Sequence, residues 1–156
     1  MHTHEKRIVH GDLKAANILY DGKTIKLTDF GDSRILGQQI PNLLDVSHSA
    51  VCFKDIKGSI LWMAPEQIQQ KPLGTRSDIW SLGQTLIELA TASHPWSELS
   101  DLNDLFKCID GRVAPAIPAH LSSPAQDFLS QCLQYDKQAR PSAQQLLQHE
   151  WLLRDD

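Results

Sequence analysis

Four polar side chains near the start of the chain have the types and spacing that phosphoryl transfer to a hydroxyl requires. Asp12 can accept the proton of an attacking hydroxyl, and Lys14 can neutralise charge on the transferring phosphate. Asn17 and Asp29 offer an amide and a carboxylate oxygen, which are ligands that suit Mg²⁺. These residues therefore predict a magnesium-dependent site built from two separate loops.

A short β-hairpin is predicted between the two halves of this site. Residues 18–20 and 24–28 contain β-branched and apolar residues, and Asp21-Gly22 between them is expected to supply the positive φ values of a tight turn. The hairpin would hold Asp29 in register with the loop that precedes it.

The remainder of the chain is predicted to be a long loop followed by helices. Residues 31–58 show no regular period, and long loops in compact domains are often functional. Beyond this loop, apolar residues recur at helical spacing after three predicted starts. These starts are Ser77 or Asp78, Ser100, and Ser123.

One of these three starts, and a fourth at Ser142, carry a capping-box pattern. Ser123 precedes Pro124 and is followed three residues later by Gln126, and Ser142 is followed in the same way by Gln145. In such a box the two side chains satisfy main-chain N–H groups at the helix start, so both sites are predicted to begin helices.

Composition excludes several classes of protein. The 156-residue chain has a formal net charge of -4, so no general basic field indicates a nucleic-acid partner. No apolar run approaches the roughly 20 residues that cross a bilayer, and no secretory signal follows Met1, so we expect a single domain in the cytoplasm without a membrane partner. The cysteines, Cys52, Cys108 and Cys132, have no Cys-x-x-Cys spacing and are expected to be reduced, with Cys132 buried.

Several motifs in this order resemble those of protein kinases. His-Gly-Asp-Leu-Lys-Ala-Ala-Asn at 10–17 resembles the catalytic loop, Asp-Phe-Gly at 29–31 the metal-binding triplet, and Ala-Pro-Glu at 64–66 the end of the activation segment. The resemblance extends through 77–83 and Arg140-Pro141. In detail the chain is similar to serine/threonine kinases of the mitogen-activated kinase kinase kinase-like (STE-type) group.

This resemblance implies a fold, cofactors and partners. The implied fold is mainly α, namely the large C-terminal lobe of a protein kinase with a β-hairpin near the catalytic loop. Residues 1–156 would form a partial kinase domain that uses ATP and Mg²⁺. The implied partners are protein substrates with serine or threonine hydroxyls, and other kinases of a signalling cascade.

The resemblance also implies individual roles for the site residues. Asp12 and Lys14 would be catalytic, Lys14, Asn17 and Asp29 would face the nucleotide, and Asn17 and Asp29 would bind the metal. Ser59 would position the substrate hydroxyl near Asp12.

A second set of residues is expected to support this site structurally. His10 would pack under Phe30, Gly31 would allow the main chain to turn, and Asp78 would accept main-chain N–H groups of the catalytic loop. A buried ion pair is expected between one acid and one base, Glu66 and Arg140.

Two departures from the family pattern bear on activity. Gly11 replaces the arginine that usually pairs with an activation-loop phosphate (a non-RD pattern), so phosphorylation at Ser47 or Ser49 is not expected to switch the site by that route. The chain also contains no Gly-rich phosphate loop or strand lysine. It is therefore expected to lack the N-terminal lobe, to expose an apolar face, and to be inactive alone.

Two other functions remain open at this stage. The chain could be a non-catalytic binding or scaffold module with a kinase-like fold. It could also be a metal-dependent phosphohydrolase using Asp12 and Asp29, although this would need further ligands. His2 and His4 are expected to be solvated at the terminus rather than to bind metal.

Overall fold

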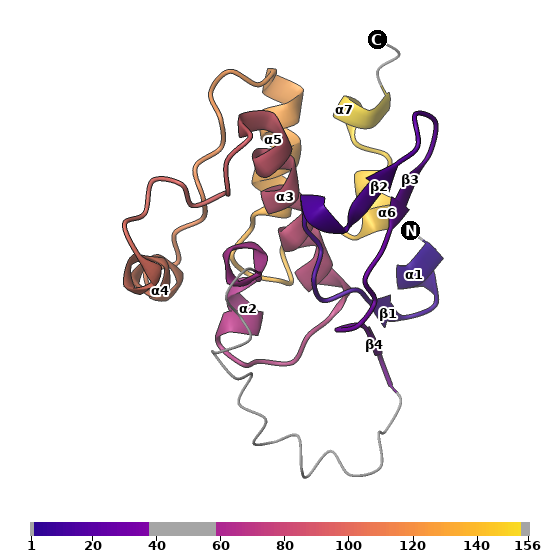
Figure 1. The fold of residues 1–156 in the computed structure, drawn as a ribbon, viewed down its shortest axis with the longest axis horizontal. Coiled ribbons are helices and arrows are strands. Elements are labelled where there is room, and N and C mark those ends of the chain that lie inside the picture. The colour runs from indigo at the N-terminus through magenta and orange to yellow at the C-terminus, as the bar shows by residue number, and fades with distance from the viewer. Residues whose placement is uncertain (1, 38–58, 154–156) are drawn as a thin grey trace.

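The computed structural model describes residues 2–37 and 59–153, and helices make up most of its regular structure (Figure 1). This agrees with the mainly α composition predicted from the sequence. The helices are α1 (His2–Glu5), α2 (Pro65–Ile68), α3 (Thr75–Thr91), α4 (Leu102–Asp110), α5 (Ser123–Cys132), α6 (Ala143–Leu146) and α7 (Glu150–Leu153), with 3₁₀ turns at Ala15–Asn17 and Ile60–Trp62.

Two small antiparallel sheets lie near the N-terminal end. Strands β2 (Ile18–Tyr20) and β3 (Ile25–Leu27) form the predicted hairpin. Strands β1 (Ile8–Val9) and β4 (Arg34–Ile35) form the second sheet. The sequence did not reveal β4, because this two-residue strand lies inside a stretch without periodicity.

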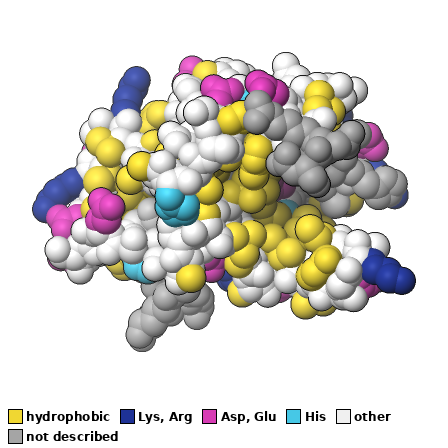
Figure 2. All heavy atoms as spheres, turned by 90° about the horizontal axis from the view of Figure 1, so that it is seen from above, with side chains coloured by type: hydrophobic (Ala, Val, Ile, Leu, Met, Phe, Trp, Pro, Cys, Tyr) yellow, Lys and Arg dark blue, Asp and Glu magenta, His cyan; other side chains and the backbone are white. Residues whose placement is uncertain are grey.

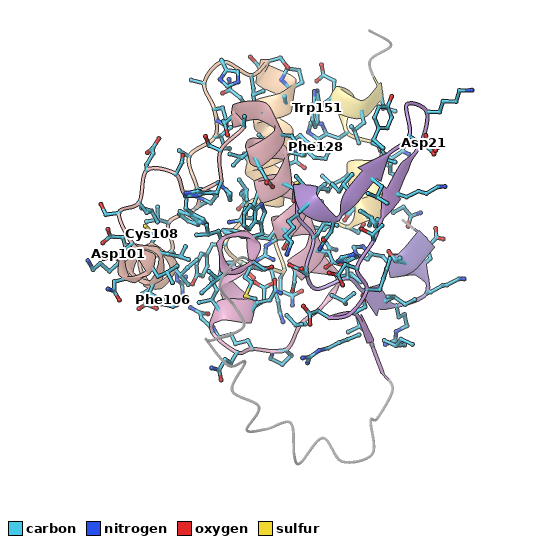
Figure 3. The ribbon with its side chains drawn as sticks, in the orientation of Figure 1. Asp21, Asp101, Phe106, Cys108, Phe128 and Trp151 are labelled. Atoms are coloured by element: carbon cyan, nitrogen blue, oxygen red, sulfur yellow. The ribbon has the colours of Figure 1, made fainter. Side chains whose placement is uncertain are left out.

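The hairpin turn differs from the one predicted. Only Gly22 has a positive φ, of 89°, so Asp21 does not supply one. Instead, the Asp21 side chain at the end of the hairpin (Figure 3) accepts the N–H groups of Lys23 and Thr24 at 3.0 and 2.8 Å. An aspartate that bonds to the main chain two and three residues later stabilises the turn without itself taking a positive φ.

Helix α3 runs through the centre of the molecule and contacts both β1 and α5. Trp80 has no exposed surface and Ile87 only 3%, and both belong to the main hydrophobic core. A Cβ at Gly83 would lie 2.9 Å from the Cβ of Cys132, so glycine is needed where α3 meets α5. Cys132 is buried as expected, and burial raises the pKa of its thiol to about 12.

A second core cluster joins α5 to the C-terminal helices. Phe128 of α5 and Trp151 of α7 lie side by side in Figure 3, with ring centres 4.9 Å apart. Their packing fixes the end of the described chain against α5.

Two helix starts lie one or more residues from the predicted positions. Helix α3 begins at Thr75, because the Ser77 hydroxyl accepts the Gly74 N–H and adds a turn before the predicted start. At α4 the N-cap is Asp101 rather than Ser100, and its carboxylate accepts two N–H groups of the first turn.

Of the two predicted capping boxes, one is confirmed and one is wrong. Ser142 and Gln145 form a box at α6. At α5 the N-cap is Ser122, which makes no side-chain cap, and Gln126 instead donates to main-chain oxygens of Ala119 and Leu121. The Gln126 side chain therefore bonds to the preceding loop and not to the N-cap residue.

Among the described residues, no helix combines the length and apolar character needed to cross a bilayer.

Candidate functional site

Asp12 lies at the centre of a cluster of polar side chains. Lys14 donates from Nζ to Asp12 Oδ2 at 2.8 Å and to Ser59 Oγ at 2.6 Å. Asn17 donates from Nδ2 to the main-chain oxygen and Oδ2 of Asp12, at 2.8 and 3.0 Å. Within the described parts of the chain, Asp12 Oδ1 has no hydrogen-bond donor. The fold thus brings four of the predicted site residues together and leaves one carboxylate oxygen available.

His10 connects this loop to the segment before Asp29. Its Nδ1 accepts the Asp12 N–H at 3.3 Å, so Nε2 carries the hydrogen and donates to the Thr28 oxygen at 3.0 Å. The Thr28 N–H in turn donates to the Asn17 oxygen at 2.9 Å. The two loops that carry Asn17 and Asp29 are therefore joined through Thr28.

The triplet at 29–31 follows this junction. The Phe30 ring centre lies 4.8 Å from that of His10, which confirms the expected packing. The expected turn at Gly31 is present, since the Ser33 N–H donates to the Phe30 oxygen at 3.1 Å across it. The positive φ of this segment, 58°, belongs to Asp29, whose short polar side chain tolerates this geometry. A Cβ at Gly31 would lie 3.2 Å from Asp29 Oδ1, so this glycine makes room for the carboxylate.

Asn17 and Asp29 carry side-chain oxygens of the type that magnesium binds. The Asn17 side chain donates through Nδ2, and Asp29 is exposed and accepts the Gly31 N–H at Oδ1. Asn17 Oδ1 and Asp29 Oδ2 have no donor among the described residues. Magnesium typically combines one or two such protein oxygens with waters and phosphate oxygens. No cluster of three His, Cys, Asp or Glu side chains suited to a metal occurs in the described ranges.

Asp78 of α3 holds the main chain of the catalytic loop. Its carboxylate accepts the N–H groups of His10 at 2.8 Å and Gly11 at 3.0 Å, as expected from the sequence. It also lies 2.8 Å from His4 Nε2, and the His4 side chain is only 17% exposed. The expectation of a solvated His4 is wrong, because the fold supplies a buried carboxylate as its partner. The side chain of His2 lies outside the described residues.

Gly11 is required by the shape of the loop. Its φ is 83°, and a Cβ there would lie 2.9 Å from the Asp32 oxygen. The Gly11 oxygen accepts from Gln67 Nε2 at 3.1 Å, and Gln67 Oε1 accepts the Ala64 N–H at 2.9 Å. Sequence reasoning missed Gln67, which joins the catalytic loop to the segment around Ala64.

Helix α3 also holds the segment that follows Ser59. Ser81 Oγ donates to the Trp62 oxygen at 2.7 Å. Glu88 Oε2 accepts from Trp62 Nε1 at 2.8 Å and from the Ala15 N–H at 3.2 Å. Sequence reasoning missed these contacts, although polar residues at positions i, i+3, i+7 and i+10 lie on one face of a helix and are a detectable signal. The residues on this face are Asp78, Ser81, Thr85 and Glu88.

The predicted ion pair between Glu66 and Arg140 is present and buried. Arg140 donates from Nη1 and Nη2 to the two Glu66 oxygens, each at 2.7 Å, and its side chain has no exposed surface. Burial by itself raises the pKa of Glu66, but the hydrogen bonds and charge of Arg140 outweigh it and hold that pKa below its usual range. The guanidinium also donates to three main-chain oxygens, those of Arg76, Gln134 and Tyr135.

Three residues named in the sequence analysis, Ser47, Ser49 and Cys52, lie outside the described residues.

Comparison with known proteins identifies the class to which this site belongs. The protein kinase domain family matches residues 1–152, so the chain belongs to the protein kinase family. Within it, the chain is similar to serine/threonine kinases of the mitogen-activated kinase kinase kinase-like group.

Three relatives illustrate this similarity. The chain is 41% identical over 155 residues to mitogen-activated protein kinase kinase kinase A of Dictyostelium discoideum. It is 38% identical over 152 residues to serine/threonine-protein kinase STE11 of Saccharomyces cerevisiae, and 41% identical over 150 residues to mitogen-activated protein kinase kinase kinase 2 of Arabidopsis thaliana. The matches cover 98%, 97% and 95% of this chain but only 15%, 20% and 22% of those proteins.

Proposed function

We propose that this chain forms the C-terminal lobe of a serine/threonine protein kinase that transfers the terminal phosphate of ATP to protein hydroxyls. The observation that carries the proposal is the Asp12 cluster, in which Lys14 joins the carboxylate to Ser59. Phosphoryl transfer depends mainly on positioning and electrostatics, which a rigid cluster of this kind supplies. The similarity to cascade kinases supports protein substrates, including other kinases, and a cytoplasmic location belongs to the same proposal.

Each residue of the cluster has a proposed task. In this proposal Asp12 orients the substrate hydroxyl at Oδ1 and accepts its proton, and Lys14 offsets negative charge on the phosphate. Ser59 marks where the acceptor residue would lie. Asn17 and Asp29 would hold Mg²⁺, which supplies charge neutralisation at the phosphate oxygens when bound.

Exposed apolar side chains support the assignment to one lobe of a larger domain. Figure 2 shows hydrophobic side chains gathered on one face of the molecule. Across the described residues, Leu19, Tyr20, Ile25 and Leu89 are 57%, 68%, 71% and 61% exposed. Apolar surface of this kind is typical of faces that pack against other protein. By itself the 156-residue polypeptide is expected to transfer phosphate too slowly to detect.

The proposal is tested by following the destination of the phosphate. A longer protein that contains this chain is incubated with labelled ATP, Mg²⁺ and a serine peptide or its alanine counterpart. We expect label on the serine peptide and none on the alanine peptide. Release of inorganic phosphate at equal rates with either peptide, and no labelled peptide, would instead support a phosphohydrolase. Neither transfer nor release would support a scaffold module.

A further inference from the structure

A hollow of about 290 Å³ lies beside α2, away from Asp12 and its partners in the chemistry. Three segments line it: α2 with the residues that follow it, the turn after α4, and the turn after α5 (Figure 1). These segments bring three basic residues to one place, namely Lys71, Arg112 and Lys137.

The two lysines are held by neutral groups. Lys71 Nζ donates to Gln69 Oε1 at 2.7 Å, and Lys137 Nζ donates to the Pro72 oxygen at 3.2 Å. Within the described parts of the chain, neither ammonium group forms an ion pair. Their positive charges are therefore positioned without being neutralised.

Arg112, which also lines the hollow, lies over an aromatic ring. Its guanidinium carbon lies 5.7 Å from the Tyr135 ring centre, a distance at which the cation is attracted to the ring. The Tyr135 hydroxyl donates to the Ile109 oxygen at 2.7 Å and accepts from Gln69 Nε2 at 2.9 Å. The ring is thus fixed, and Arg112 itself has a φ of 58°, an uncommon value for a residue with a side chain.

The acidic groups of the hollow offset only part of this charge. Glu66 belongs to the lining, but Arg140 neutralises it through two hydrogen bonds of 2.7 Å. Asp136 accepts the Gln138 N–H at Oδ1. Three cations thus face a single acid that is not paired, in a chain whose overall net charge is -4.

We propose that this hollow binds an acidic segment of a partner protein, which inserts a glutamate or aspartate carboxylate between Lys71, Arg112 and Lys137. The volume suits one or two side chains rather than a drug-sized ligand. Two compact ammonium groups and one guanidinium provide charge complementarity for a carboxylate. This inference stands apart from the proposed catalytic function, since it requires no phosphoryl transfer.

Peptide binding measured by fluorescence anisotropy tests the proposal on the protein that contains this chain. The probe is a labelled peptide of alternating glutamate and glycine, with glutamine replacing glutamate in a matched peptide. We expect the glutamate peptide to bind and the glutamine peptide not to bind. The double variant Lys71→Gln with Lys137→Gln should weaken binding about fivefold, the effect of two exposed ion pairs. The control, Lys23→Gln with Lys26→Gln, removes the same charge from the hairpin and should leave affinity unchanged.

A second measurement uses the wild-type protein, so its result does not depend on whether the variants fold. Acetylation of lysines by a small reagent is followed by mass spectrometry with and without the glutamate peptide. Protection of Lys71 and Lys137, but not of Lys23 and Lys26, would support the proposal. Equal binding of the glutamate and glutamine peptides, equal weakening in the control variant, or uniform protection would overturn it. Binding of a phosphoserine peptide without binding of the glutamate peptide would also overturn it.

Discussion

The Asp12 cluster and the Glu66–Arg140 pair use the same kinds of charge in opposite ways. Every N–H of the Arg140 side chain has an acceptor, and neither partner has more than 6% of its side chain exposed. Around Asp12, by contrast, the Lys14 side chain is 21% exposed and one carboxylate oxygen has no donor among the described residues. A fully satisfied pair can only support the structure, whereas an incompletely satisfied cluster can bind and react.

The largest expected effect comes from a substitution in the Asp12 cluster. In a kinase-active protein containing this chain, Asp12→Asn should lower kcat about 1,000-fold, because the proposed general base is lost. Thermal stability should change little, since the amide oxygen can still accept from Lys14 and Asn17. Phosphorylation of a serine peptide and a melting curve measure the two quantities. Asp21→Asn in the exposed hairpin turn is the matched control, and similar losses in both variants would contradict the prediction.

The next largest effect is expected when the Glu66–Arg140 pair is broken. Arg140→Ala should lower the free energy of unfolding by about 3–5 kcal/mol, because Glu66 would become a buried charge without its partner. Urea denaturation gives this quantity directly. Arg34→Ala removes an exposed arginine from β4 and should change stability by no more than about 0.5 kcal/mol. A loss in Arg140→Ala as small as that of the control would show that the pair is not supporting the fold.

A smaller effect is expected when Gly11 of the catalytic loop is replaced by alanine. Gly11→Ala and Gly22→Ala both place a side chain at a positive φ, which costs about 1–2 kcal/mol. Only Gly11 would also bring its Cβ within 2.9 Å of a main-chain oxygen, whereas no atom lies within 4 Å at Gly22. Denaturation should therefore show the greater loss for Gly11→Ala. Equal losses would mean that the loop moves to accept the methyl group.

The smallest effect concerns pH. The folded protein holds the pKa of Glu66 below its ordinary value of 4.5, so the ionised pair stabilises the fold fully above that pH. This contribution is lost as the pH falls through the depressed folded-state pKa. The stability difference between the wild-type protein and Glu66→Gln should therefore shrink on acidification. Urea denaturation from neutral pH to about pH 3 measures it, and a constant difference would exclude Glu66 as the titrating group.

Features with a local pattern could be predicted from the sequence. The buried face of α5 follows from apolar residues at helical spacing, and Ala125, Phe128 and Leu129 are each no more than 3% exposed. The helix starts were less predictable, because neighbouring polar residues compete to cap the same turn. At α4, for example, Asp101 takes the role expected of Ser100.

Contacts between distant segments were the hardest to predict. The Asp12 cluster was predicted because its motif spans few residues, and Ser59 was added through family resemblance. Gln67 and Glu88 bond to residues more than 50 positions away in sequence, so no local pattern identifies their partners. His4 was misjudged for the same reason, since only the fold brings Asp78 beside it.

The polar stripe on α3 also sets a limit on how this protein can change. Because each residue of an α-helix turns the chain by about 100°, inserting a single amino acid between Asp78 and Ser81 would rotate one half of the stripe away from the other. The catalytic loop and the Trp62 segment would then lose their shared anchor at the same moment. Insertions and deletions should therefore be tolerated far less in helix α3 than in the turns around it, even though α3 takes no direct part in the proposed reaction.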